Sequence, residues 1–379
     1  MKFLNNKEFV ILMGICLFSA LGALHLNMSL STPIKIGFSG SLTGFKSEIG
    51  VNGRNGTLLA VEDINRQGGI KGRKVELVVA DDKYSKKAAL EADQYLARQG
   101  VRFIIGHMTS DMAELTVPFA DTQDLLLISP TISTEDLTGL DDHFIRTIPS
   151  NKVQAGCLAK AATVYAGVNK IVAVYDAENA SFAKPIIVTF QENLKKTSGD
   201  IIFVEPYHQQ EDFVQILRRI QATDANGILI VASSIDAAMF CQQSKKMGIK
   251  KPIFFPMWTM TNDFILAGGT AVEGAYLINQ EDLVSEVLAY RDFRRRYNER
   301  YGAEPTFSAI LSYDAAMVLF EGMKLAQDMS VDGVKAAILQ KERFQGLQQE
   351  IQIDRYGDAV GGYYLYRVQD GVFVKVGPI

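Results

Sequence analysis

The sequence predicts an α/β protein built from two lobes. From position 33 onward, short apolar and β-branched runs alternate with longer amphipathic stretches, which is the pattern of parallel strands joined by helices. At 379 residues the chain is longer than a single hydrophobic core usually grows. No linker, internal repeat or low-complexity tract interrupts it, so we expect two lobes that share crossing segments rather than two beads on a string.

The N-terminal segment 1–32 is typical of an export signal. Lys2 and Lys7 precede an uncharged apolar run at 9–24 that fades into polar residues. Small residues near the end of the run fit a cleavage site. The alternative is an uncleaved membrane anchor at 9–26, because the run is only slightly shorter than the ~20 residues that span a bilayer. We therefore expect a protein exported to the periplasm.

Eight segments have the near-continuous apolar composition of strands that are covered by helices on both faces. They are 34–38, 74–80, 101–106, 125–129, 170–175, 200–205, 227–232 and 251–256. The helices expected between them are 54–67, 86–99, 110–122, 153–166, 212–222 and 235–247. Several of these helices run into a glycine, such as Gly100 and Gly248. Glycine is favoured just past a helix because it adopts the left-handed conformation without Cβ strain.

The pattern changes after residue 275. Three helices with little strand between them are expected at 285–301, 308–327 and 332–340. The chain then ends in two apolar runs, 363–368 and 372–377, on either side of an Asp-Gly pair. Because Asp-Gly between alternating apolar runs is a strong hairpin signal, the last segment is predicted to be a β-hairpin.

Composition and motifs argue against nucleic-acid binding and against catalysis. The net charge is −4, and the one dense basic stretch, 291–300, alternates with acidic and aromatic residues as a solvated helix face would. The sequence has no Walker A loop, no GxGxxG or GxSxG motif, and no histidine pair with metal-ligand spacing. We therefore expect a protein that binds without turnover and that needs no cofactor and no metal.

The three cysteines, Cys16, Cys157 and Cys241, lie too far apart for a zinc site or a redox pair. Cys157 and Cys241 both occur in helical patterns of small and apolar residues. Buried, inert thiols are the usual explanation for such cysteines, and a disulfide between these two is the alternative.

Polar loops follow three strands of the expected sheet, at 40–50, 106–112 and 129–138. Ligands bind at the carboxyl ends of parallel strands because free backbone amides and helix dipoles there favour polar or anionic groups. Three hydroxyl-rich loops at these ends predict a cradle for a carboxylate. Ser110 fits this cradle and fits an ordinary helix cap equally well. Asp111 is expected to be a first-turn acid that the helix dipole stabilises.

These loops resemble those of the type I periplasmic binding proteins of the leucine/isoleucine/valine family. The resemblance rests on IKIGFSGSLTG, GVNGRNGTLLAVEDINRQGGIKGRKVELVVADD, FIIGHMTSDMAELTVPFAD and LLLISPTISTEDLT, and it extends to RTIPSN and AVEGAY. It implies a clamshell of two Rossmann-like lobes joined by a three-segment hinge that closes on a ligand. Lobe 1 would take 33–150 plus 279–357, and lobe 2 would take 151–278 plus 358–379.

The resemblance also implies the positions of the ligand contacts. On lobe 1, Ser110 would hold a ligand carboxylate together with Thr131 and Ser133. Ile49 would cover the ligand, and Thr109 would lie beside Ser110.

On lobe 2, the predicted contacts depart from the family pattern. Met257 and Trp258 stand where the family has a glutamate that pairs with a ligand ammonium, while Phe182 and Ser233 stand at or near the places of two tyrosines. An unpaired buried ammonium is costly, so an α-amino acid needs another acid. The candidates are Asp111, Asp176, Glu178 and Asp236.

Trp258 leaves two interpretations open, because a lone tryptophan either packs in the core behind the cleft or stacks on a ligand. In the second case an aromatic or apolar ligand body is indicated. A branched-chain amino acid and a carboxylate with an aromatic or apolar body thus both remain candidate ligands.

Two functions are consistent with the sequence. The first is a solute receptor for an ABC importer, whose permease would be the protein partner. The second is a membrane-anchored sensor of the same fold that signals to a membrane partner. In either case we expect a small-molecule ligand, no nucleic acid, and a monomer or a weak dimer.

Overall fold

The computed structural model describes residues 32–44, 46–208 and 213–379. The predicted export signal, apart from Thr32, lies outside these residues. Within the described ranges, no helix combines the length and the apolar composition that a membrane span requires.

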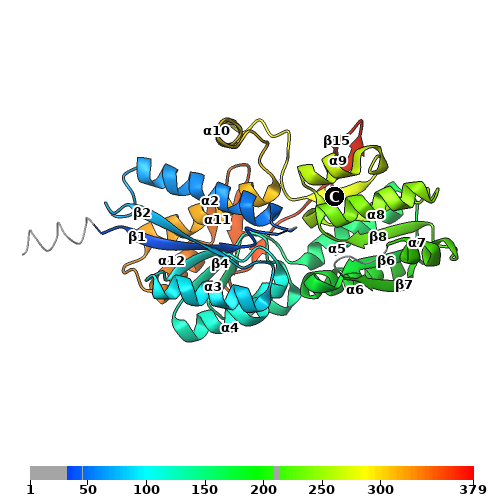
Figure 1. Ribbon diagram of the computed structural model, residues 1–379. Coiled ribbons are helices and arrows are strands. Elements are labelled where there is room, and N and C mark those ends of the chain that lie inside the picture. The colour runs from blue at the N-terminus through cyan, green and yellow to red at the C-terminus, as the bar shows by residue number, and fades with distance from the viewer. Residues whose placement is uncertain (1–31, 45, 209–212) are drawn as a thin grey trace, which may run out of the picture.

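The first sheet contains five parallel strands in the order β2-β1-β3-β4-β5. Their bounds are β1 (Ile34–Gly40), β2 (Val75–Asp81), β3 (Phe103–Gly106), β4 (Leu126–Ser129) and β5 (Phe144–Arg146). Helices cover both faces (Figure 1). One face carries α2 (Glu48–Arg66), α11 (Phe307–Leu325) and α12 (Val331–Lys341), and the other carries α3 (Lys86–Arg98) and α4 (Ala113–Gln123). Ile104 and Ile105 pack on opposite sides, which explains why this strand is apolar without alternation.

The second sheet has the order β15-β14-β10-β9-β8-β6-β7. Its parallel strands are β6 (Lys170–Asp176), β7 (Asp200–Tyr207), β8 (Gly227–Val231), β9 (Ile253–Phe255) and β10 (Tyr276–Asn279). The predicted C-terminal hairpin is present as β14 (Tyr364–Gln369) and β15 (Val372–Pro378), antiparallel to each other and to β10. Helices α5 (Asn151–Lys160) and α6 (Ala180–Lys195) cover one face. Helices α7 (Phe213–Gln221), α8 (Ser234–Lys246) and α9 (Asn262–Gly268) cover the other.

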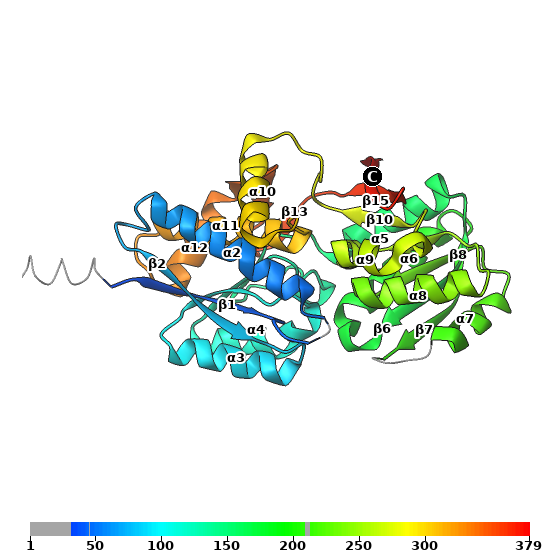
Figure 2. The same ribbon diagram turned by 45° about the horizontal axis from the view of Figure 1, so that its top comes forward.

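The remaining elements join the first sheet. They are α10 (Leu288–Tyr301) and a small sheet of β11 (Arg343–Gln345), β12 (Glu350–Ile353) and β13 (Ala359–Val360). Helix α10 lies beside α2 (Figure 2), where Arg296 donates two hydrogen bonds of 2.8 Å to the carboxylate of Asp63.

The chain passes between the two sheet regions three times. It leaves the first after β5, returns after β10 and leaves again after β13 (Figure 2). These observations confirm the predicted fold class, with two α/β lobes joined by three segments. The residue limits that we gave the lobes, 33–150 plus 279–357 and 151–278 plus 358–379, stay a prediction.

Five strands were not predicted from the sequence: β5, β10, β11, β12 and β13. Each has two to four residues. The start of the helix expected at 54 was also wrong, because α2 begins at Glu48. The glycines in its first half hid it. A Cβ at Gly50 would lie 1.9 Å from the carbonyl oxygen of Ser41, and one at Gly56 would lie 2.0 Å from that of Ala309. These glycines therefore let α2 approach the loop after β1 and the backbone of α11.

Cys157 and Cys241 are both buried and free. The alternative of a disulfide between them is therefore wrong, and the expectation of buried thiols is confirmed. Burial raises the pKa of Cys157 to about 11 and that of Cys241 to about 12, so neither thiol is a reactive thiolate at neutral pH.

Candidate ligand-binding site

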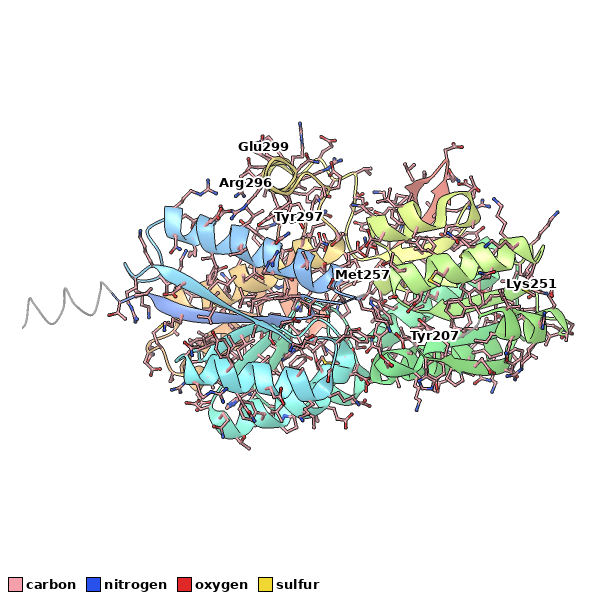
Figure 3. The ribbon with its side chains drawn as sticks, in the orientation of Figure 1. Tyr207, Lys251, Met257, Arg296, Tyr297 and Glu299 are labelled. Carbon is pink, nitrogen blue, oxygen red and sulfur yellow. The ribbon has the colours of Figure 1, made fainter. Side chains whose placement is uncertain are left out.

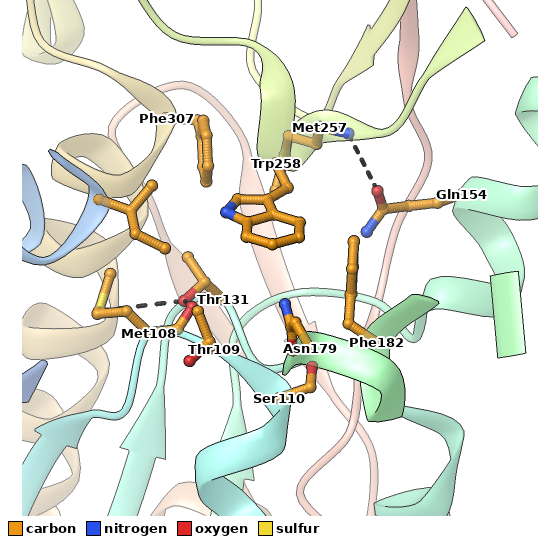
Figure 4. A pocket seen from close by; sticks show the side chains of 11 residues that line it. Met108, Thr109, Ser110, Thr131, Gln154, Asn179, Phe182, Met257, Trp258 and Phe307 are labelled. Atoms are coloured by element: carbon orange, nitrogen blue, oxygen red, sulfur yellow. Dashed lines mark hydrogen bonds between the residues drawn. The ribbon is translucent and has the colours of Figure 1, made fainter. Parts of the chain in front are cut away.

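A small cavity lies between the two lobes, at the carboxyl ends of their parallel strands (Figure 4). Eleven residues line it: Ile49, Met108, Thr109, Ser110, Thr131, Gln154, Asn179, Phe182, Met257, Trp258 and Phe307. We call this cavity the pocket.

Lobe 1 supplies a polar wall from the loops after β3 and β4. The hydroxyl of Thr131 donates to the carbonyl of Met108 at 2.8 Å, which ties the two loops together. The hydroxyl of Ser110 accepts the amide of Ser133 at 3.4 Å, so this contact links the same two loops. Hydroxyl groups at strand ends are thereby held in place beside the cavity.

A buried histidine supports this wall from behind. His107 follows β3, and its ring nitrogens lie 3.0 Å from carboxylate oxygens of Asp82 and Asp93. Burial by itself lowers the pKa of His107, but the two carboxylates outweigh it and raise the pKa to about 10. The carbonyl of His107 accepts the hydroxyl of Ser129 at 2.8 Å, which joins β3 to β4 just before the pocket loops.

Lobe 2 supplies an aromatic and amide wall. Trp258 lies in the short 3-10 helix η5 (Met257–Thr259) after β9, and its ring meets that of Phe182 edge to face, with centroids 5.8 Å apart. Gln154 accepts the backbone amide of Met257 at 3.3 Å. Figure 3 places Met257 at the boundary between the lobes, and Figure 4 shows the Trp258 indole among the lining side chains of both lobes.

Electrostatically, the pocket is neutral. Among the described residues that line it, none has an ionisable side chain, and its polar groups are hydroxyls and side-chain amides. Its apolar part joins the cores of the lobes, since Ile49, Trp258 and Phe307 belong to one hydrophobic cluster. The site can therefore hydrogen-bond a polar group at one wall and enclose an apolar body at the other.

Seven of the ten residues predicted from the sequence line the pocket: Ile49, Thr109, Ser110, Thr131, Phe182, Met257 and Trp258. Trp258 thus borders the cavity rather than only the core behind it. The hydroxyl of Ser110 bonds to the neighbouring loop, and the helix-cap interpretation has no hydrogen bond to support it.

Three predicted residues do not line the pocket. Asp111 accepts the amide of Ser181 at 2.7 Å, a contact between the lobes, and lies 3.2 Å from Lys86. Ser233 caps α8, where it accepts the amide of Asp236. Ser133 is fully buried behind Ser110. The side chains of Asp111 and Ser233 are thus engaged by local partners, whereas the buried Ser133 hydroxyl has no hydrogen-bond partner within the described part of the chain.

Four lining residues were not predicted: Met108, Gln154, Asn179 and Phe307. Met108 and Asn179 follow the ends of strands β3 and β6. This position after a strand end is the sequence signal that could have identified them as lining residues. Gln154 and Phe307 lie in the first turns of α5 and α11, and nothing in the local sequence distinguishes them from helix surface or core.

Polar contacts between the lobes surround the pocket. Besides the contact of Asp111 with Ser181, the carboxylate of Glu48 on α2 accepts the hydroxyls of Ser234 at 2.9 Å and Thr261 at 2.6 Å on lobe 2. Burial raises the pKa of Glu48 to about 7, with the nearby Asp263 adding to the effect and the two hydroxyls opposing it. These contacts correspond to closed lobes.

A sequence model of the family described as periplasmic binding protein matches residues 33–372. The chain is 24% identical over 250 residues to the Leu/Ile/Val-binding protein of Escherichia coli (strain K12), which covers 65% of this chain and 68% of that protein. It is 22% identical over 330 residues to the leucine-, isoleucine-, valine-, threonine-, and alanine-binding protein of Pseudomonas aeruginosa, which covers 86% of this chain and 87% of that one.

Solved structures share the fold. A leucine binding protein from Thermotoga maritima superposes with a TM-score of 0.85 at 23% identity, over 91% of this chain and 98% of that one. A solute binding protein of an ABC transporter from R. palustris, in complex with benzoate, gives a TM-score of 0.83 at 19% identity, over 92% and 96% of the two chains. At these identities the likeness shows the fold alone.

Proposed function

The chain belongs to the periplasmic binding proteins, and we propose that it captures a small carboxylate with an aromatic or apolar body between its lobes for an ABC importer. Its relatives are substrate-binding proteins and not enzymes. Binding of a small solute thus follows from the family, and the chemical class of that solute is what we propose.

The neutral lining of the pocket is the observation that carries the proposal. An α-amino acid brings a carboxylate and an ammonium, and an unpaired buried ammonium is expensive. None of the four acids considered from the sequence lines the pocket. Asp111 contacts Ser181 and Lys86, and both Asp176 and Asp236 lie beside Lys46. A carboxylate, in contrast, needs hydrogen-bond donors, which Thr109, Ser110 and Asn179 can supply.

The apolar lining favours an aromatic or branched body. Phe182, Trp258 and Phe307 present ring surfaces, and Met108 and Met257 add polarisable side chains that adapt to a ring. The R. palustris neighbour of the same fold was solved with benzoate, and this ligand has the chemistry that we propose.

A branched-chain amino acid is the second candidate, because several relatives are named for binding leucine, isoleucine and valine. In that case the ammonium would depend on neutral groups such as the Gln154 and Asn179 side-chain oxygens. Matched ligand pairs separate the two candidates.

The test is a thermal-shift comparison of leucine with 4-methylpentanoate and of phenylalanine with 3-phenylpropanoate, with benzoate as a fifth ligand. The members of each pair differ only by the ammonium group. Binding stabilises the folded state by RT ln(1 + [L]/Kd), so we expect the acids without the ammonium to raise the melting temperature more. Larger shifts with the amino acids would overturn the proposal.

Delivery to a permease, rather than signalling from a membrane anchor, is part of the same proposal. It is supported by relatives that are named as transporter binding proteins. Mass spectrometry of the protein from its native membrane and periplasmic fractions tests it. We expect a chain that starts near Ala23 in the soluble fraction, whereas an intact Met1 in the membrane fraction would favour the anchored sensor.

A further inference from the structure

A lysine of lobe 1 is buried against two carboxylates of lobe 2, outside the pocket. Lys46 lies in the loop between β1 and α2, and only 2% of its side chain is exposed. Its ammonium donates to the carboxylate of Asp176 at the end of β6 and lies 3.8 Å from that of Asp236 in α8. None of these three residues lines the pocket.

Two tyrosines complete this cluster. The Lys46 ammonium lies 4.6 Å from the centre of the Tyr84 ring, and the Tyr84 hydroxyl donates to Asp176 at 3.4 Å. The Tyr207 hydroxyl donates to Asp236 at 3.0 Å. We call Lys46, Tyr84, Asp176, Tyr207 and Asp236 the interlobe ion cluster.

Both carboxylates have further partners within lobe 2. Asp176 accepts the amide of Glu178 at 2.9 Å, and Asp236 accepts the hydroxyl of Ser233 at 3.0 Å. Lobe 2 therefore holds the acids in position on its own, and the contribution of lobe 1 is chiefly the cation and the tyrosine against which it packs.

Closure of the lobes buries these charges. In open lobes, Lys46 and the acids of lobe 2 would each face water. In the closed arrangement they lose hydration, and only a well-placed opposite charge compensates for that loss. Without Lys46, closure would bury two neighbouring carboxylates that lack a cation, which is strongly unfavourable.

We propose that Lys46 determines how readily the lobes close, and that it acts on ligand affinity through the lobes and not through contact with the ligand. The proposal rests on ligand capture between the lobes. The apparent affinity of a ligand is its intrinsic affinity multiplied by the fraction of protein in the competent state. A change at Lys46 therefore alters the affinity for different ligands by one common factor.

The experiment measures Kd by calorimetry for Lys46→Met and the unchanged protein with two ligands of different shape, benzoate and 4-methylpentanoate. Leucine and valine take their place if the thermal-shift comparison selects amino acids, so failure of the proposed ligand class leaves this test intact. Methionine keeps most of the side-chain volume and removes the charge. Lys335→Met is the matched control, because Lys335 on α12 pairs with Asp141 at 2.7 Å, and neither residue belongs to the interlobe ion cluster or lines the pocket.

We expect Lys46→Met to weaken both ligands by the same factor, at least roughly 30-fold, since truncating one member of a buried charge pair costs an association 2 kcal/mol or more. Most of the change should appear as faster dissociation. Lys335→Met should bind like the unchanged protein. The double variant Lys46→Met with Asp176→Asn should recover part of the lost affinity, because it removes one of the two unpaired acids.

Three results would overturn the proposal. The first is binding by Lys46→Met within threefold of the unchanged protein. The second is a loss that differs tenfold or more between the two ligands, which would place Lys46 in contact with the ligand. The third is a double variant that binds no better than Lys46→Met, because a purely structural loss does not depend on the charge of Asp176.

Discussion

The pocket and the contacts that surround it differ in charge. The residues that line the pocket in the described chain are neutral, whereas the surrounding lobe-to-lobe contacts use charged side chains, namely Lys46, Glu48, Asp111, Asp176 and Asp236. Hydrogen-bond geometry and ring surfaces can then select the ligand, while buried charges govern closure. Ligand selectivity and lobe closure should therefore respond to different substitutions.

The largest effect inside the pocket is expected from Trp258→Ala. The indole borders the cavity and packs edge to face on Phe182, so its removal takes away an aromatic wall. Truncating a well-packed aromatic at the centre of a binding surface costs about 2–4 kcal/mol of binding free energy, so we expect ligand affinity to fall by roughly 100-fold. Calorimetry with benzoate measures it. Trp258→Phe should retain most of the affinity, and unchanged binding by Trp258→Ala would mean that the indole only supports the core.

Met257→Glu tests the neutrality of the pocket directly. A carboxylate at this position would offer a partner to a ligand ammonium and repel a ligand that has only a carboxylate. We expect the ratio of leucine affinity to 4-methylpentanoate affinity to rise by roughly 30-fold, equivalent to about 2 kcal/mol. Met257→Gln is the control of similar size, and its ratio should stay near that of the unchanged protein. If the ratio does not differ between the two variants, the side chain at position 257 does not lie beside the ligand.

Ser110→Ala tests the polar wall. A hydrogen bond to a charged group is worth about 1.5–3 kcal/mol, so a carboxylate that bonds to this hydroxyl should bind roughly tenfold more weakly. The Ser110 hydroxyl makes only a long contact to the Ser133 amide, so the melting temperature without ligand should change little. An equal loss for benzamide, which has no carboxylate, would show that the serine does not act on the anionic group.

The lobe 1 half of the pocket was predictable because its residues follow strand ends. Thr109, Ser110 and Thr131 come directly after apolar strands, and parallel strands bring their carboxyl ends to one edge. Gln154 was missed because it lies in the first turn of a helix, and its place beside the cavity depends on how lobe 2 closes on lobe 1. That arrangement is set by contacts between residues far apart in the chain.

The charged contacts around the pocket were even harder to predict from the sequence. In the sequence, Lys46 is one lysine in a polar loop, and its partner Asp176 lies 130 positions away. Asp176 and Asp236 were considered as partners of a ligand ammonium, but in the structure they meet a lysine of the chain itself. The sequence pattern identified Asp176 and Asp236 as candidate acids, but it could not show that Lys46 is the cation that pairs with them.

The last effect that we predict is a pH dependence of ligand affinity through Glu48. Its ordinary pKa is 4.5, and burial between the lobes raises the pKa to about 7. The closed form therefore holds a proton more tightly than the open form. This contribution to closure is fully present below about pH 4.5, and it is lost as pH rises towards 7 and the open form gives up its proton. Affinity should fall between pH 5 and pH 7, and should level off above that.

The groups that face Glu48 decide how this dependence is isolated. Ser234 and Thr261 donate to it and do not titrate in this range, and Asp263 on α9 adds negative charge. Other buried acids also titrate near neutrality, because burial raises the pKa of Asp314 to about 7 and that of Glu281 to about 8. Glu48→Gln keeps an acceptor for the two hydroxyls without the titration, so calorimetry from pH 5 to pH 8 should give a flatter profile for this variant. If the variant and the unchanged protein have the same profile, the pH dependence belongs to another group, and Glu48 stabilises closure by its hydrogen bonds alone.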